Sequence, residues 1–240
     1  DEAQDTESSF SRASSLMPHP ARKVTSMNVT TPDSTLRYQF VAGNLALDFT
    51  NTADWHEAEH PVEMLLSYTE LLRWGQQAGV LDDGDVSRLL RAAENDPEAA
   101  VTTYARAITL REALFRIFRG VARRQPASPD DLGLLNDELA RAFSHRQVVA
   151  GLDGYALEWR GRETALDGGL WTVAQSATDL LTEAELRRVR QCAGDPCGWL
   201  FYDTSRNRRR RWCSMEGCGN RAKARRYYER RRDSRPTSGS

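Results

Sequence analysis

Four cysteines are the residues of this sequence whose type and spacing indicate a chemistry most directly. They form two C-x4-C pairs with fifteen residues between them: Cys192 with Cys197, and Cys213 with Cys218. Two matched pairs at such a separation are typical of a structural site that holds Zn²⁺ by four thiolates. The even count also fits two disulfides, but disulfide scaffolds are usually smaller and richer in cysteine. We therefore predict one structural Zn²⁺ bound by sulfur alone.

The stretch that carries the cysteines is strongly basic. Residues 187–240 contain 16 Lys or Arg against five acids, a balance of +11, so the remaining residues carry −12 in a chain of net charge −1. A basic end joined to an acidic body is typical of a nucleic-acid-binding module attached to something else. A protein-interaction adaptor that docks an acidic partner is an alternative interpretation of the same charge.

The candidate nucleic-acid contacts are the polar and basic residues around the second cysteine pair. They are Arg206, Asn207, Arg208, Arg209, Arg210, Arg211, Asn220, Arg221, Lys223, Arg225, Arg226 and Arg230. Arginine prevails, and its planar fork suits phosphates and guanine edges. Duplex DNA is the favoured partner, while RNA stays open because Tyr227 and Tyr228 offer rings for stacking on unpaired bases. For Asn220, a role in capping or starting a helix is an equal alternative.

Composition divides the chain into four parts. Residues 1–36 are rich in Ser, Thr, Asp and Pro and are predicted to be a disordered arm, with a second disordered tail at 236–240. Residues 37–186 are predicted to form a helical body, and 187–235 a module too small for a core of its own, which a metal would stabilise. No apolar run approaches the ~20 residues that cross a bilayer, so we expect no membrane partner and a cytoplasmic location.

Hydrophobic periodicity predicts the elements of both parts. In the body these are helices over 63–79, 101–124 and 170–181, another helix that begins at Ser128, and a β-hairpin of 147–150 with 155–160. The cysteine module is predicted to contain a short strand within 198–202 and a helix over 220–232. The expected fold is therefore α+β: a predominantly helical body with a small β-hairpin, then a zinc-ribbon or treble-clef-like module that ends in a helix.

One charged residue falls within the apolar rows of the body. Arg111 takes a step of a helical apolar row, so its guanidinium is expected inside, where it needs a partner. The favoured partner is a buried carboxylate such as Asp48 or Glu112. The alternative is an effector pocket in which Arg111 binds an anionic small molecule together with Asn44, Asp48 and Asn51. That pocket assumes an extended segment over 44–51, because a helix would distribute these polar side chains differently.

His56, Glu57 and His60 spell H-E-x-x-H, the zinc-binding pattern of hydrolases. That chemistry needs both histidines on an uninterrupted helix, and Pro61 disfavours helical geometry at His60. No third ligand is evident. A zinc hydrolase is thus a weak alternative, and we expect a solvated loop and no catalytic residue.

Three strings resemble a known family. Residues 213–221, CSMEGCGNR, preceded by DTSRN at 203–207, resemble the CGNR zinc finger. The strings GNLALDFTNT at 43–52 and LREA at 110–113 resemble the ABATE domain that usually precedes that finger. The resemblance implies a bacterial, cytoplasmic, stress- or ligand-responsive transcription regulator with a nucleic-acid-binding zinc finger. Because one finger gives limited specificity, a homodimer is plausible.

Overall fold

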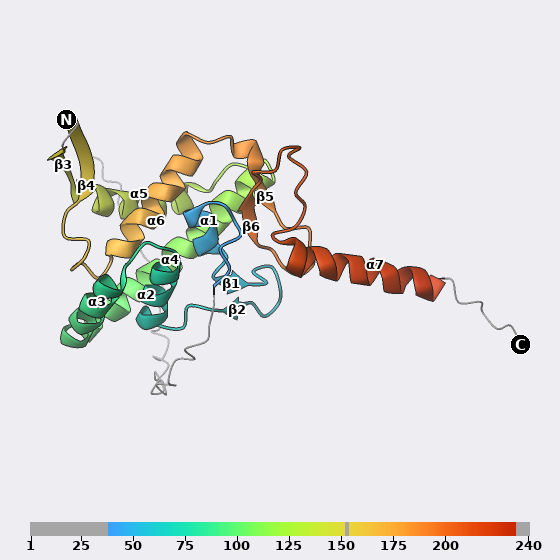
Figure 1. Cartoon of the computed structure of the whole chain (residues 1–240), viewed down its shortest axis with the longest axis horizontal. Coiled ribbons are helices and arrows are strands. Elements are labelled where there is room, and N and C mark those ends of the chain that lie inside the picture. The colour runs from blue at the N-terminus through green and yellow to red at the C-terminus, as the bar shows by residue number, and fades with distance from the viewer. Residues whose placement is uncertain (1–37, 152–153, 234–240) are drawn as a thin grey trace, which may run out of the picture. The chain divides into compact units, whose positions relative to one another are not determined.

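The computed structural model describes residues 38–151 and 154–233 (Figure 1). The predicted arm over 1–36 and the predicted tail over 236–240 lie outside these residues. The body contains α1 (Leu45–Thr50), α2 (Tyr68–Gln77), α3 (Asp83–Asn95), α4 (Pro97–Ala122), α5 (Pro129–Phe143) and α6 (Gly168–Thr182). Two antiparallel pairs accompany these helices: β1 (Ala53–Asp54) with β2 (Val62–Glu63), and β3 (Arg146–Gly151) with β4 (Gly154–Trp159).

The cysteine module follows α6. It begins with the 3-10 turn η1 (Leu186–Arg188) and the antiparallel pair β5 (Val189–Gln191) and β6 (Leu200–Tyr202). The π-type turn η2 (Met215–Gly219) then leads into α7 (Asn220–Asp233). The predicted fold class is confirmed: helices predominate, the sheets are small and antiparallel, and the cysteine module ends in a helix.

The central helix is α4, which packs against α1, α2, α3 and α5 (Figure 1). It begins four residues before the predicted start, because Asp96 caps it by accepting a hydrogen bond from Ala99 N (2.9 Å) and Pro97 occupies its first turn. Its predicted double apolar row faces the core: Leu114 and Phe118 are fully covered, whereas Tyr104, Ile108, Val121 and Ala122 are half-buried. The length of α4 thus provides one surface on which most of the body packs.

The predicted helix over 63–79 is shorter in the structure. Ser67 Oγ accepts from Glu70 N at 3.3 Å and caps α2, while residues 62–63 form β2 instead of a helical turn. The end is as predicted: Gly79 follows the last turn with φ of +72°, a conformation that glycine adopts without strain.

Periodicity missed two helices of the body, α1 and α3. In α3, Asp82 and Asp85 form a reciprocal capping box, with Asp85 N donating to Asp82 Oδ1 at 2.7 Å. Its apolar face is narrow, since Leu89 is its one fully covered hydrophobic residue among those that the structure describes. The other predictions hold: α5 starts after Ser128, α6 covers the predicted stretch, and the hairpin has Val148 opposite Leu157.

Body and cysteine module share one hydrophobic core. A single cluster of buried residues contains Ala46 and Phe49 from α1 together with Trp199, Leu200 and Phe201 from the module. The module therefore does not depend on the metal alone for its interior, because its short strands are packed against the body. No helix in the described part of the chain combines the length and apolar character needed to cross a membrane.

Candidate metal centre and basic surface

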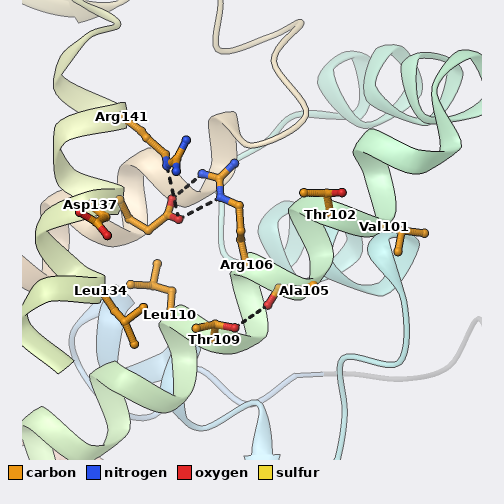
Figure 2. Close-up of a pocket in the computed structure, with 10 residues that line it drawn as sticks. Val101, Thr102, Ala105, Arg106, Thr109, Leu110, Leu134, Asp137 and Arg141 are labelled. Atoms are coloured by element: carbon orange, nitrogen blue, oxygen red, sulfur yellow. Dashed lines mark hydrogen bonds and ion pairs between the residues drawn. The ribbon is translucent and has the colours of Figure 1, made fainter. Parts of the chain in front are cut away.

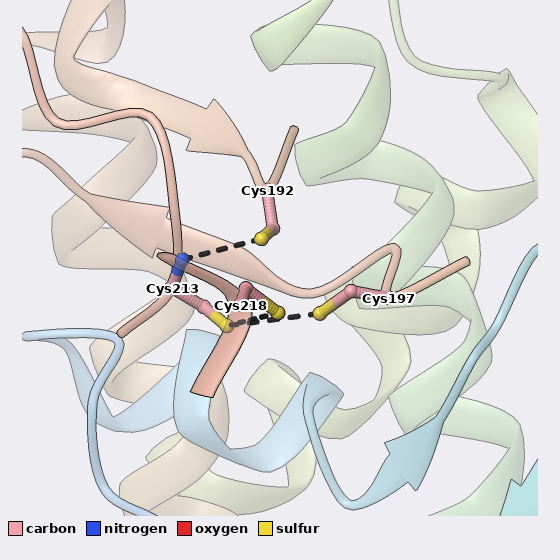
Figure 3. A group of neighbouring side chains, drawn as sticks. All are labelled: Cys192, Cys197, Cys213 and Cys218. Carbon is pink, nitrogen blue, oxygen red and sulfur yellow. Dashed lines mark hydrogen bonds between the residues drawn. The ribbon is translucent and has the colours of Figure 1, made fainter. Parts of the chain in front are cut away.

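The four cysteines converge from separate segments (Figure 3). Cys192 follows β5, Cys197 precedes β6, Cys213 closes the intervening loop, and Cys218 lies in η2. All four thiols are buried and unbridged, and their Sγ atoms lie within 4.8 Å of one another. The Cys213 Sγ atom is 3.6 Å from both Cys197 Sγ and Cys218 Sγ. A tetrahedron with Zn–S of ~2.3 Å has S···S of ~3.8 Å, so these residues fit one Zn²⁺.

Backbone amides surround the first cysteine. Gly194 N and Cys213 N donate to Cys192 Sγ at 3.4 and 3.3 Å. Neighbouring thiols first, and these amides next, lower the pKa of Cys192, which favours the thiolate that a metal needs. Only glycine fits at 194, because a Cβ there would lie 2.9 Å from Cys218 Cβ. The turn between Cys192 and Cys197 thus packs closely against the cysteine side chains.

Two predicted nucleic-acid contacts have structural partners beside the metal centre. Arg221 donates from Nη2 to Cys218 Sγ at 3.0 Å. Asn220 is the first residue of α7, as the structural alternative expected, and its Nδ2 donates to the carbonyl of Glu216 in the preceding turn at 3.2 Å. Arg221 places its positive charge against a thiolate, as groups in the outer shell of a zinc site do.

The loop between the cysteine pairs is organised by a buried carboxylate. Asp203 accepts from Ser205 N at 2.9 Å and from Arg210 N at 3.1 Å. Arg210, another predicted contact, turns inward: it donates to the carbonyls of Val41 (2.7 Å) and Cys213, and its guanidinium lies 4.3 Å from the Phe201 ring. Arg210 therefore fastens the loop to the body.

The remaining predicted contacts have exposed side chains, as do Asn220 and Arg221. In the loop and on α7 the remaining contacts are Arg206, Asn207, Arg208, Arg209, Arg211, Lys223, Arg225, Arg226 and Arg230. Two of them reach acids at 3.4 Å, Arg208 with Glu185 and Arg225 with Asp195. Exposed pairs of this kind are weak, so these cations stay available to a polyanion.

Sequence reasoning missed how the body holds the module. The side chain of Asn51 donates from Nδ2 to Leu200 O and accepts from Leu200 N, both at 2.9 Å. Next to it, Tyr202 N donates to Ala42 O at 2.7 Å. The body thus forms hydrogen bonds with the backbone of β6, as a neighbouring strand would. No spacing signal identifies this contact, because its partners are about 150 positions apart in the chain.

The extended segment on which the effector pocket was predicted is a helix. Asn44 caps α1 by accepting from Leu47 N at 3.2 Å, and Asp48 Oδ1 accepts from Ala42 N at 2.9 Å. Burial raises the pKa of Asp48 to about 6 against an ordinary 3.8, although hydrogen bonds from the backbone of Ala42 and Val41 and the charge of Arg210 lower it. The expectation of a strand with grouped polar side chains was therefore wrong, because helical capping uses the same asparagine.

The fourth residue of that predicted pocket, Arg111, is buried and fully paired. Its guanidinium donates to both carboxylate oxygens of Glu63 (2.6 and 2.7 Å) and to Glu112 (2.8 and 3.0 Å). The sequence predicted Glu112 as a partner of Arg111 but did not predict Glu63. Asp48, the other predicted partner, instead accepts a hydrogen bond from Ala42 N. Burial alone would raise the pKa of Glu112, but the hydrogen bond from His56 and the charge of Arg111 outweigh it and lower the pKa to about 2.

The H-E-x-x-H residues lie in the turn between β1 and β2, not on a helix. The His56 side chain is only 5% exposed, its Nε2 is 3.3 Å from Glu112 Oε1, and its ring stacks on Phe115 at 3.8 Å. The expectation of a solvated loop was thus wrong for His56, whereas His60 is exposed. Glu57 pairs with Arg123, the residue that follows α4, at 2.5 Å. In the described residues, the group of side chains placed to hold a metal is the four cysteines.

A cavity of 460 Å³ lies between α4 and α5 (Figure 2). Arg106 crosses it to Glu138 at 2.5 Å and continues to Asp167 at 3.1 Å. The charged lining also includes Asp137 and Arg141, and the apolar lining includes Val101. These residues differ from the four that were predicted to bind an effector.

A helical body that shares its core with a four-thiolate module defines a zinc-finger protein of two fused parts. Residues 43–184 match the ABATE family, described as putative stress-induced transcription regulator, and residues 188–231 match the CGNR zinc finger. The chain belongs to the ABATE family and carries a C-terminal CGNR zinc finger with four cysteines that could bind one zinc ion. These family descriptions name a regulator and a zinc finger, not an enzyme. No curated protein matches the chain.

Proposed function

We propose that this chain regulates transcription by binding duplex DNA through its zinc finger, with the ABATE domain as the effector-sensing part. The observation that carries this proposal is the set of exposed cations in the loop before Cys213 and on α7, next to the four cysteines in the chain. Four thiolates and one Zn²⁺ together carry −2, so residues 187–240 would retain roughly +9 with the metal bound. A field of that sign and size suits a phosphate backbone.

The salt dependence of binding tests the DNA part. The full chain, loaded with zinc, is titrated onto a short DNA duplex at several salt concentrations. If six phosphates are neutralised, log Kd changes with log salt with a slope of magnitude about 5. Combined replacement of the loop cations Arg206, Arg208, Arg209 and Arg211 by alanine leaves the metal ligands in place and should lower that slope by about 3 or more.

A slope near zero, or tighter binding to single-stranded RNA than to the duplex, would contradict the DNA proposal. A variant with all four cysteines changed to serine should lose binding together with its zinc. The loop variant retains zinc, so it separates loss of contacts from loss of the fold.

The sensing part is supported by the family description and by the cavity between α4 and α5. Native mass spectrometry of the purified full chain tests whether a small molecule is retained. Ala105 is exposed and lines the cavity, so Ala105→Phe should fill the space without disturbing the core and should abolish retention. Retention unchanged in this variant would place the effector elsewhere.

A further inference from the structure

The helix α7 has two sides with different surroundings. Arg221 bonds to Cys218 Sγ (3.0 Å) and Arg225 reaches Asp195 (3.4 Å), so the side that carries them faces the metal centre. Residues three, four or seven apart share a helix side, which adds Tyr228 and Arg232 to this side by their position on the helix. Their side chains are exposed, because α7 extends away from the body (Figure 1). We call the side that carries these four residues the inner side of α7.

The opposite side of α7 carries Lys223, Arg226, Tyr227 and Arg230. Lys223 and Arg230 are each three and four positions from the other two, and each of the four lies two positions from an inner-side residue, which is about 200° around the helix. All four side chains are exposed. Arg231 Nη1 donates to Tyr227 Oη at 3.2 Å, and the Tyr227 ring meets the edge of the Tyr228 ring with 5.7 Å between the ring centroids. The acid Glu229 follows Arg225 by four positions and therefore belongs to the inner side. Among the described side chains, the outer side thus combines cations with an aromatic ring and has no acid.

We propose that the outer side of α7 lies in the major groove of duplex DNA, an assignment that rests on the proposed function. Lys223 and Arg230 contact the phosphates of the groove walls, and Tyr227 faces the base edges. An α-helix with its side chains is ~10–12 Å wide and the major groove of B-DNA is ~12 Å wide, so the helix fits. Double-stranded RNA excludes it, because the A-form major groove is deep and narrow.

The chain offers a matched control for this assignment. The outer-side variant Tyr227→Ala/Arg230→Ala and the inner-side variant Tyr228→Ala/Arg232→Ala each remove one ring and one positive charge from the same part of α7. Each is made in the full chain, and its zinc content and circular dichroism are checked. We expect the outer-side variant to weaken binding to a DNA duplex at least about tenfold and the inner-side variant less than about threefold.

A second measurement tests the groove directly. The probes are an unmodified duplex, the same duplex with glucosylated hydroxymethylcytosine that fills the major groove, and double-stranded RNA of the same sequence. Unmodified DNA should bind at least about tenfold more tightly than the other two. Equal losses in the two double variants, or equal binding to the glucosylated duplex, would overturn the helix assignment while DNA binding stands. Failure of the full chain to bind any duplex would overturn the proposed function itself.

Discussion

The side chain of Asn51 forms two 2.9 Å hydrogen bonds with the backbone of Leu200, one as donor and one as acceptor. An amide side chain therefore takes the place of a strand beside β6. Both residues are buried, so neither bond has water as an easy substitute. This contact explains how a cysteine module of about fifty residues is held in a fixed orientation on the helical body.

Replacing Asn51 with alanine should leave the N–H and C=O of Leu200 buried without partners. We expect the free energy of unfolding to fall by about 2–4 kcal/mol, since each unpaired buried group costs about 1–2. Urea denaturation measures this loss. Zinc release to a chelating dye should also accelerate, because β6 is next to Cys197. Thr204→Ala, an exposed change in the same module, is the control, and equal stability of the two variants would contradict the role of Asn51.

Removal of zinc should destabilise the body as well as the finger. Because Trp199, Leu200 and Phe201 belong to the core that contains α1, separation of the four thiolates opens that core. The zinc-loaded chain should melt in a single transition, and chelation should lower the melting temperature of the helices. Circular dichroism at the helical minimum measures this melting temperature with and without the chelator. A body transition that stays at the same temperature after chelation would show that the two parts fold independently.

Arg221 should slow the loss of zinc through its bond to Cys218 Sγ. Arg221→Met keeps the length of the side chain but removes the donor, and a roughly tenfold faster release of zinc is expected, a size typical of second-shell changes. Substitution of Cd²⁺ for zinc gives a second readout, since the ¹¹³Cd chemical shift responds to hydrogen bonding at the thiolate. Arg226→Met, one turn further along α7, should leave both readouts unchanged; equal effects of the two variants would remove the special role of Arg221.

The pKa of Asp48 gives stability a defined pH dependence. Its folded value of about 6 exceeds the ordinary 3.8, so the folded state binds the proton more tightly than the unfolded chain. The resulting stabilisation is complete below about pH 4 and is lost as the pH rises through about 6. Asp48→Asn resembles the protonated form and should gain about 1 kcal/mol relative to the parent chain between pH 5 and pH 7. Parallel stability curves for both chains over that range would refute this.

The number of zinc ions per chain tests whether the H-E-x-x-H residues bind zinc in addition to the four cysteines. His56 contacts Glu112 and stacks on Phe115, and the motif lies in a turn. We expect one zinc per chain by elemental analysis, and the same value in Glu57→Gln and His60→Ala. Two zinc ions in the parent chain, with one lost in the His60 variant, would instead support a second metal site.

Features that depend on local spacing and residue type could be predicted from the amino-acid sequence. The two cysteine pairs predicted the metal centre, Ser128 and Pro129 predicted the start of α5, and the apolar rows predicted the buried central helix. These patterns can be recognised without the tertiary structure, because ligand spacing, capping and helical periodicity involve residues that are near one another in the chain.

Tertiary structure alone decided which polar residues serve the fold and which face solvent. Asn51 and Arg210 look like free polar groups in the sequence, yet each hydrogen-bonds to a backbone carbonyl of a distant segment. Arg230, of the same residue type, is exposed. Composition cannot separate these cases, because the partner of a buried polar group is set by which distant segments the core brings together.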